Sequence, residues 1–153
     1  MSQTKSPAKP RTILAFDFGT TRIGVAVGQE LLGTANSLPP LQARDGIPNK
    51  EQLEKLLKEW QPDAFVVGLP LNMDGTESEM SRRARKFGNR LYGQYGKPWF
   101  GMDERGTTKQ AKQIAKELGH KGSYKKTPVD GIAAQLILEA WFAELQREQP
   151  TEV

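Results

Sequence analysis

Two strand-like segments joined by a very short turn open the body of the chain. TILAFDF (residues 12–18) is apolar and rich in strand-forming residues, and RIGVAVGQ (residues 22–29) follows after only a Gly-Thr-Thr turn. Strands connected so closely are expected to pair with each other as an antiparallel hairpin. The chain is therefore restricted to folds that have a sheet at their centre.

The rest of the sequence alternates between strand-like and helical segments. A third, short strand is expected near GTANSLPPL (residues 33–41), where Pro39-Pro40 would close it. Two later strands are expected at DAFVVGLP (63–70) and KPWFGM (97–102). The spacing of apolar residues predicts four helices, one capped by Asn49, two over about 76–95 and 111–118, and a last one capped by Thr127 with Pro128 at its first position. This order predicts an α/β fold, a five-stranded mixed sheet with helices on its faces.

The composition excludes several kinds of site. Among 153 residues there are no Cys and one His (His120), which excludes a disulfide scaffold, thiolate chemistry and any site built on several imidazoles. The net charge is +4 and the pI is about 9.4, which favours an anionic partner. The length predicts one domain over residues 11–149, between a disordered tail (1–10) and a flexible end (150–153). Without a membrane-spanning apolar run or a signal peptide, the expected location is cytoplasmic.

Acidic residues follow two of the expected strands and open the last helix. Asp17 ends the first strand on the same face as Ala15, where a carboxylate is costly unless it is bonded. Asp103 and Glu104 follow WFGM directly, and only one of two adjacent side chains can face Asp17 if that strand continues. We favour Glu104 and keep Asp103 as its alternative. Asp130 lies in the first turn of the last helix, where the helix dipole favours an acid.

Each of these acids also has a purely structural interpretation. Asp17 could accept hydrogen bonds from the turn that follows it. Glu104 could pair with Arg105, and Asp130 could bond back to the cap of its own helix. The functional interpretation depends on all three acids converging at one end of the sheet. Like charges so close repel unless a cation neutralises them, and a pair of Mg²⁺ or Mn²⁺ ions held there could activate water for phosphodiester cleavage.

Two stretches of the chain carry most of its positive charge. Residues 82–97 hold six basic residues and no acid: Arg82, Arg83, Arg85, Lys86, Arg90 and Lys97. Residues 105–126 hold seven against one acid: Arg105, Lys109, Lys112, Lys116, Lys121, Lys125 and Lys126. Either stretch alone could be a solvated helix face, but two that flank the acids favour binding of a phosphate backbone. Four aromatic residues could stack on unpaired bases or pack in the core: Tyr92, Tyr95, Trp99 and Tyr124.

Four ordered motifs resemble the YqgF/RuvX family, whose members are named as Holliday-junction resolvases or as nucleases for precursor small-subunit ribosomal RNA. The motifs are ILAFDFGTTRIGVAVG (13–28), VVGLPLNMDGTES (66–78), MDERGTT (102–108) and TPVDGIAAQLILEAWF (127–142). The resemblance covers residues 12–145. It implies a ribonuclease-H-like fold with a five-stranded mixed sheet.

The resemblance also implies which residues act. The metal-binding and catalytic acids would be Asp17, Glu104 (or Asp103) and Asp130. The substrate-binding positions would be Gly19, Thr20, Arg22, Asn72, Arg105, Thr107 and Thr108. The basic helix face adds Lys109 and Lys112 as candidate phosphate contacts.

Several functions remain compatible with the sequence. The first is a Mg²⁺- or Mn²⁺-dependent nuclease for precursor 16S ribosomal RNA. It would be a monomer or weak dimer and would have no membrane partner. The second is resolution of branched DNA, and the third is a nucleic-acid-binding protein without catalysis. DFGTTRIG is also similar to the phosphate-holding hairpin of actin-like ATPases and sugar kinases, but those proteins usually need two such domains around the nucleotide.

Overall fold

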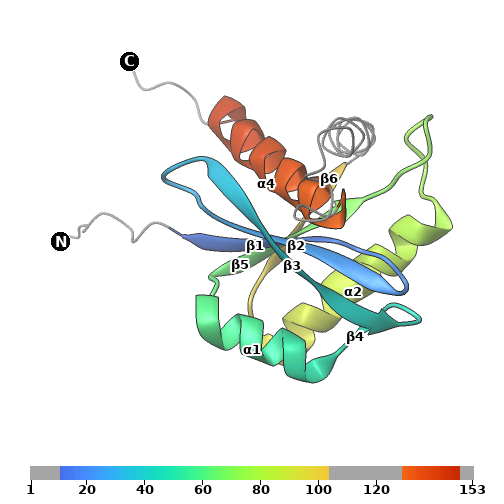
Figure 1. Cartoon of the computed structure of the whole chain (residues 1–153). Coiled ribbons are helices and arrows are strands. Elements are labelled where there is room, and N and C mark those ends of the chain that lie inside the picture. The colour runs from blue at the N-terminus through green and yellow to red at the C-terminus, as the bar shows by residue number, and fades with distance from the viewer. Residues whose placement is uncertain (1–10, 104–128, 149–153) are drawn as a thin grey trace, which may run out of the picture.

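The chain forms one mixed sheet with helices on both sides (Figure 1). The computed structural model describes residues 11–103 and 129–148, the second range with side chains for residues 131–146. The strands in this part are β1 (Thr12–Asp17), β2 (Arg22–Gln29), β3 (Thr34–Arg44), β4 (Ile47–Pro48), β5 (Ala64–Leu69) and β6 (Trp99–Asp103). The helices are α1 (Lys50–Trp60), α2 (Glu79–Tyr95) and α4 (Val129–Glu148). The expected α/β fold with a mixed sheet is confirmed.

The strands lie in the order β4-β3-β2-β1-β5-β6. From β1 to β4 each strand pairs antiparallel with the next, as the short turn after β1 predicts. On its other side β1 pairs parallel with β5, and β5 pairs parallel with β6. The carboxyl ends of β1, β5 and β6 therefore lie at the same end of the sheet.

The expected number of five strands is wrong, because the described part of the chain forms a six-stranded sheet. β3 is longer than predicted, and the additional short strand β4 follows it. Pro39-Pro40 does not close β3, which continues to Arg44 and turns back into the two-residue β4. The register explains why the prolines are tolerated. Ile23 pairs with Leu41 and Val25 with Leu38, so two residues of β3 face one of β2 at a bulge. The regular hydrogen-bond ladder is interrupted at a bulge, so the N–H groups that proline lacks are not needed there.

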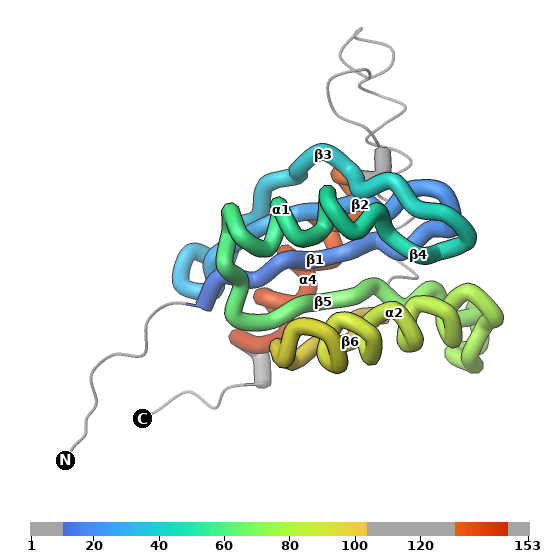
Figure 2. Tube along the Cα trace, turned by 90° about the horizontal axis from the view of Figure 1, so that it is seen from below, coloured from blue at the N-terminus to red at the C-terminus, as the bar shows by residue number. Residues whose placement is uncertain are grey.

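α1 and α2 lie on one face of the sheet and α4 on the other (Figure 2), and two apolar clusters hold these three layers together. On one face of the sheet, Leu14 and Phe16 of β1 pack with buried residues of α1 and α2. On the other face, Ile13 and Ala15 pack with α4. Alternate residues of β1 thus enter different clusters, as a strand covered on both faces requires. We call these the α2 face and the α4 face of the sheet.

The helices begin where capping side chains satisfy their first N–H groups. Asn49 Oδ1 accepts from the Gln52 N–H at 2.9 Å, which confirms the predicted start of α1. Ser78 Oγ accepts from the Ser81 N–H at 2.9 Å, so α2 begins at Glu79, three residues after the expected start at Thr76. The predicted helix over 111–118 and the cap of the last helix at Thr127-Pro128 lie outside the described residues.

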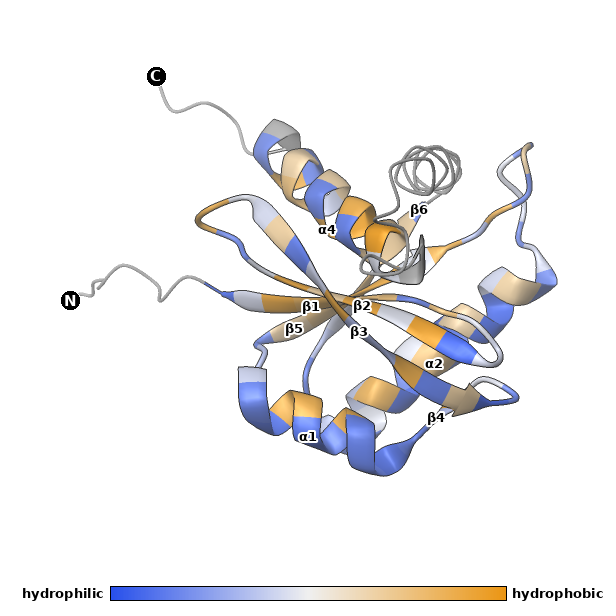
Figure 3. Cartoon of the chain, in the orientation of Figure 1, coloured by the Kyte–Doolittle hydropathy of each residue, from blue (hydrophilic) through white to orange (hydrophobic). Residues whose placement is uncertain are grey.

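The surface of the described part is polar where the helices face away from the sheet (Figure 3). α1 and α2 turn hydrophilic residues outward and apolar residues toward the strands. None of the helices described is both long and apolar enough to cross a membrane.

Candidate functional site

Asp17 is the last residue of β1 and lies on the α4 face. Strand alternation places it there, because Ile13 and Ala15 belong to the cluster under α4 whereas Leu14 and Phe16 belong to the cluster under α2. The residue is half-buried. The placement agrees with the face that the sequence predicts for this acid.

Glycines flank Asp17 within the sheet. Asp17 pairs with Gly24 of β2, and the register between Phe16 and Val67 brings Gly68 of β5 to its other side. Since glycine has no side chain, neither neighbour in this row fills the space beside the carboxylate. Gly68 in turn pairs with Met102 of β6. The row therefore runs from Gly24 through Asp17 and Gly68 to Met102.

The start of α4 lies at the same end of the sheet as Asp17. A Cβ on Gly131 would be 3.0 Å from the Cβ of Ser37 in β3, whereas Gly33, before the start of β3, lies near Gln146. α4 therefore runs along β3 from the end where β1 finishes. Ser37 pairs with Ala26 of β2, two residues from Gly24. Asp130 is the second residue of α4, so its backbone enters the helix close to the row that contains Asp17.

Asp103 lies on the opposite face from Asp17. Phe100 stacks on Trp141 of α4 with ring centroids 5.3 Å apart, and Met102 packs against the same α4 cluster. Trp99 packs into the cluster of the α2 face. Asp103 alternates with Met102 and pairs with Leu69, a member of the α2-face cluster. The strand geometry thus favours the neighbour of Asp103 as the acid that faces Asp17. That neighbour, Glu104, lies outside the described residues.

Carboxylate oxygens suit the divalent cation expected at this site. Mg²⁺ and Mn²⁺ prefer oxygen ligands, and Asp17 offers a carboxylate whose two neighbours in the sheet are glycines. Within the described part of the chain, no three His, Asp or Glu side chains form a group that could hold a metal. The trio with Glu104 and Asp130 includes two side chains outside the described part, so it stays a prediction.

The turn between β1 and β2 is fixed from its other side by the turn between β3 and β4. The Gly46 N–H donates to the Thr20 carbonyl at 2.9 Å, and the Ala43 N–H donates to the Thr21 carbonyl at the same distance. A Cβ on Gly19 would be 2.3 Å from the Arg22 carbonyl oxygen, so only glycine fits there. The predicted substrate positions Gly19, Thr20 and Arg22 therefore lie beside Asp17 on a well-supported backbone.

Phe18 and Arg83 hold these two turns against α2, a feature that sequence analysis missed. The Phe18 ring lies 5.6 Å from that of Phe87 in α2, and a Cβ on Gly46 would be 2.7 Å from it. Arg83 of α2 donates to the carboxylate of Asp45 at 2.8 Å and to its carbonyl at 3.0 Å. The Asp45-Gly46 dipeptide, typical of a hairpin turn, was the signal available in the sequence.

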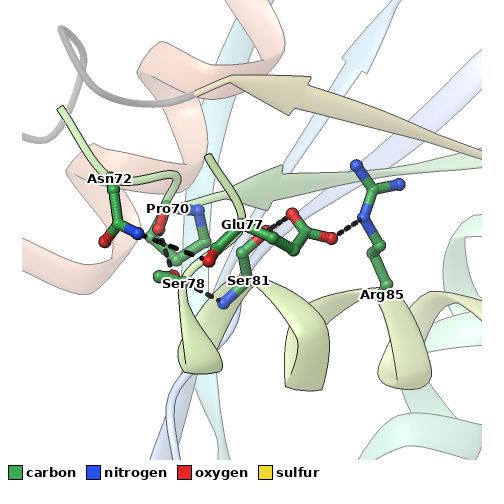
Figure 4. A network of polar contacts seen from close by, with 6 residues as sticks. All are labelled: Pro70, Asn72, Glu77, Ser78, Ser81 and Arg85. Atoms are coloured by element: carbon green, nitrogen blue, oxygen red, sulfur yellow. Dashed lines mark hydrogen bonds and ion pairs between the residues drawn. The ribbon is translucent and has the colours of Figure 1, made fainter. Parts of the chain in front are cut away.

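Asn72 has a structural role in the loop after β5. Its side-chain N–H groups donate to Thr76 Oγ1 at 3.0 Å and to the Glu77 carbonyl at 3.3 Å, and the second of these bonds is drawn in Figure 4. The two bonds close the loop on itself. Its assignment as a substrate contact stays a prediction. The other predicted substrate positions, Arg105, Thr107, Thr108, Lys109 and Lys112, lie outside the described residues.

A buried serine fastens this loop to α2. Ser81 is fully buried and its hydroxyl donates to Glu77 at 2.6 Å, while Arg85 Nε donates to the other oxygen of Glu77 at 2.5 Å (Figure 4). The hydrogen bond from Ser81, helped by Arg85 and Arg82, holds the pKa of the Glu77 carboxyl below its ordinary value. The loop that leaves β5 at the Asp17 end of the sheet is thereby held in one arrangement.

The aromatic side chains that could stack on bases differ in exposure. Tyr92 on α2 is 59% exposed. Tyr95 and Trp99 pack against the α2-face cluster, and the Trp99 indole N–H donates to Asn89 at 3.0 Å. Of this set, Tyr92 is available for stacking, and Tyr124 lies outside the described residues.

Comparison with solved structures confirms the ribonuclease-H-like fold. A structure of Thermus thermophilus RuvC in complex with a Holliday junction substrate superimposes with a TM-score of 0.50 at 18% identity, covering 92% of this chain and 99% of that one. The Fowlpox virus resolvase, in complex with Holliday junction DNA, gives a TM-score of 0.54 at 14% identity over 88% and 98% of the two chains. At these identities the likeness concerns the fold alone.

Comparison of sequences identifies the family. A protein from Chromohalobacter salexigens named "Putative pre-16S rRNA nuclease" is 67% identical over 137 residues, 90% of this chain and 93% of its own. A protein of the same name from Saccharophagus degradans is 60% identical, over 88% of this chain and 94% of its own. The family model described as "RuvX: Holliday junction resolvase" matches residues 11–144, which include every strand described above as well as Asp17. The chain therefore belongs to the RuvX family.

Proposed function

We propose that this chain is a metal-dependent nuclease that hydrolyses phosphodiester bonds in the precursor of 16S ribosomal RNA. The observation that carries the proposal is the position of Asp17, at the end of β1 between Gly24 and Gly68 and near the start of α4. A half-buried carboxylate at the end of a strand, with glycines on both sides of it in the sheet, is suited to hold a hard cation. The nuclease activity and its RNA come from the names of the relatives from Chromohalobacter salexigens and Saccharophagus degradans.

Three acids share one task in this proposal. Asp17, Glu104 and Asp130 would hold the cations, and Asp130 lies in the first turn of α4, where the helix dipole favours a negative charge. When bound, Mg²⁺ or Mn²⁺ lowers the pKa of a water and stabilises the leaving oxygen at the scissile phosphate. Glu104 is preferred to Asp103 as the second ligand, because Asp103 is on the α2 face of β6. A strand that continues by one residue returns to the α4 face.

The turn after Asp17 is proposed to position the RNA. Gly19 allows a close approach to the backbone, Thr20 offers a hydroxyl and Arg22, exposed at the start of β2, offers a guanidinium for phosphate. The predicted substrate positions within residues 104–128 would add further contacts to the RNA. We further propose a cytoplasmic location, as RNA processing by relatives with this name suggests, and a monomer or weak dimer.

Resolution of branched DNA is the second candidate, favoured by the description of the family as Holliday junction resolvases. Symmetric cutting of a four-way junction requires two active sites, and therefore two copies of the chain. Processing of a single RNA strand requires only one. Substrate choice and oligomeric state are thus linked.

The two candidates are separated by one cleavage assay with purified protein. Precursor 16S RNA and a four-way DNA junction are each incubated with Mg²⁺, with Mn²⁺ and with a chelator. The proposal expects RNA cleavage that the chelator abolishes. Symmetric junction cutting without RNA cleavage would favour the second candidate. Binding of either substrate without any cutting, beside active control enzymes, would favour a non-catalytic nucleic-acid-binding protein.

A further inference from the structure

The outer side of α2 carries a concentration of positive charge. The helix has one acid, Glu79, and five basic residues: Arg82, Arg83, Arg85, Lys86 and Arg90. Its buried residues turn toward the sheet, and the basic residues are exposed except for Arg83, which is half-buried. This arrangement follows from the amphipathic pattern of the helix.

Acids neutralise only part of this charge. Arg83 is paired with Asp45 at 2.8 Å and Arg85 with Glu77 at 2.5 Å. Arg82 lies close enough to Glu77 to help lower the pKa of that carboxyl. In the part of the chain with described side chains, neither Lys86 nor Arg90 forms an ion pair, and both are exposed. These two side chains therefore present net positive charge to the solvent.

Lys86 and Arg90 line a hollow between α2 and the turn that joins β3 to β4. The hollow has a volume of about 210 Å³, and its walls also include Phe18, Arg83 and residues 45–47. Arg83, Lys86 and Arg90 are spaced at i, i+3 and i+7, so they follow one face of the helix over about 10 Å. Arg83 and Lys86 also border a second hollow of about 460 Å³, together with Arg82 and Arg85. Together the hollows form a basic track along α2.

The basic track begins next to the candidate active site. Phe18, which lines the smaller hollow, directly follows Asp17 in the chain and points to the α2 face while Asp17 points to the α4 face. The Gly46 N–H, in another wall of the hollow, is bonded to the carbonyl of Thr20. A strand bound at the Asp17 end of the sheet can therefore continue around this end onto α2.

We propose that Lys86 and Arg90 bind backbone phosphates of the RNA substrate, away from the bond that is cut. The inference rests on the proposed function for the identity of the strand. Its physical basis is charge complementarity: Arg matches phosphate geometry with two parallel hydrogen bonds, and Lys binds it as a compact point charge. Arg83 supports the site by fixing the β3–β4 turn as its opposite wall. Contacts of this kind fix the register of a strand without reading its sequence.

The test measures RNA binding by a chain that cannot cut. Fluorescence anisotropy of a fluorescein-labelled, single-stranded RNA of about 20 nucleotides, longer than common single-strand sites, is followed at several KCl concentrations with Asp17→Asn. Adding Lys86→Gln and Arg90→Gln should raise Kd about tenfold and lower the slope of log K against log salt by about 1.4, because each lost phosphate contact on a single strand removes about 0.7.

Lys55→Gln with Lys58→Gln is the matched control, because it removes the same charge from exposed positions of α1 on the same face of the sheet. The control should leave the slope unchanged. If the α2 and α1 variants change Kd and slope equally, the inference is wrong. Should the α2 double variant unfold, Lys86→Gln alone must still lower the slope by about 0.7.

Failure of this inference can be told from failure of the proposed function. If the chain without substitutions cuts no RNA but the α2 variant still lowers the slope, the nuclease proposal fails and the phosphate site stands. If that chain cuts RNA while the α2 variant binds as tightly as the control, the phosphate site fails and the nuclease stands.

Discussion

Asp17 of β1 pairs directly with Gly24 of β2 across the antiparallel ladder. The parallel register with β5 places a second glycine, Gly68, on its other side. Neither of these neighbours has a side chain that would cover the carboxylate. This relationship separates Asp17 from an acid that is merely tolerated at the end of a strand, and it motivates the first prediction.

Asp17→Asn should lower RNA cleavage by about a thousandfold, since loss of a metal ligand removes several kcal/mol of charge stabilisation and 1.4 kcal/mol corresponds to tenfold. RNA binding should be unchanged or tighter, because a negative charge that faces phosphate is lost. The measurements are single-turnover cleavage and fluorescence anisotropy. Glu59→Gln, which removes one exposed negative charge from α1, is the control. Undiminished cleavage by Asp17→Asn would point to a contaminating nuclease.

Glu104→Gln should impair cleavage far more than Asp103→Asn. The reason is the alternation of β6, in which Met102 packs on the α4 face with Asp17, and Asp103 lies on the α2 face. We expect a hundredfold or greater difference in kcat, corresponding to about 3 kcal/mol. Both variants should unfold at similar urea concentrations. A larger effect of Asp103→Asn would show that the strand ends before the alternation continues.

Ser81→Ala should raise the pKa of the Glu77 carboxyl toward its ordinary value of 4.5, and more so than Arg85→Gln. The Ser81 hydroxyl is the largest cause of the lowered pKa and is fully buried, so no water replaces it readily. A carboxyl-detected NMR titration of Glu77 in the two variants measures this directly. A greater rise of the Glu77 pKa in Arg85→Gln than in Ser81→Ala would contradict the prediction. It would show that the ion pair with Arg85 is the dominant contact.

The layers of the fold were predictable because they depend on local patterns. The apolar run of β5 indicates a strand buried on both faces, and the spacing of Leu53 and Trp60 indicates the inward side of α1. Both agree with the structure. The end of β3 was not predictable, since Pro39-Pro40 is typical of a strand end. Only the pairing with β2 shows that the prolines fall at a bulge.

The candidate site also has features that could be predicted from the sequence and features that could not. The face of Asp17 followed from counting along one strand. The glycine beside it on β5 could not be found from the sequence, because it depends on which strands become neighbours. The same limit applies to the contact of Phe18 with Gly46, which joins two turns that are distant in the chain. Residues fixed by alternation were predictable, and those fixed by strand order were not.

Gly96→Ala should destabilise the fold by about 1–2 kcal/mol, the cost of a left-handed conformation alone for a residue other than glycine, and Gly46→Ala by about 1 kcal/mol more. Both glycines have positive φ, +82° and +72°. Only the Cβ at Gly46 meets another group, the Phe18 ring at 2.7 Å. Gly96→Ala is thus a control for backbone strain.

The clash that Gly46→Ala causes should also disturb the candidate active site. Phe18 follows Asp17, and the Gly46 N–H supports the Thr20 carbonyl. We therefore expect Gly46→Ala, but not Gly96→Ala, to lower kcat under conditions in which both remain folded. Urea unfolding and cleavage assays provide the two readouts. Equal losses of stability would mean that the Phe18 ring moves aside without cost.

The ion pair of Arg11 with Glu30 should make the stability of the fold depend on pH in the acidic range. Arg11 donates to both carboxylate oxygens of Glu30, at 2.7 and 2.9 Å, and joins the start of β1 to the end of β2. This hydrogen bonding holds the pKa of Glu30 below its ordinary value of 4.5. A carboxyl whose pKa is lowered by folding stabilises the fold above its unfolded pKa, and the contribution is lost as pH falls through the folded pKa.

Glu30→Gln should therefore reduce the stability at pH 7 and flatten its decline below about pH 4.5. The side chains are 38% (Arg11) and 28% (Glu30) exposed, so solvent screens the pair and the expected loss at pH 7 is below about 1 kcal/mol. Urea unfolding from pH 7 to pH 3 measures both effects. Arg11→Gln should flatten the same range, because it removes the cause of the lowered pKa while leaving the carboxyl in place. A pH dependence that survives in both variants would assign the acid sensitivity of the fold to another carboxyl.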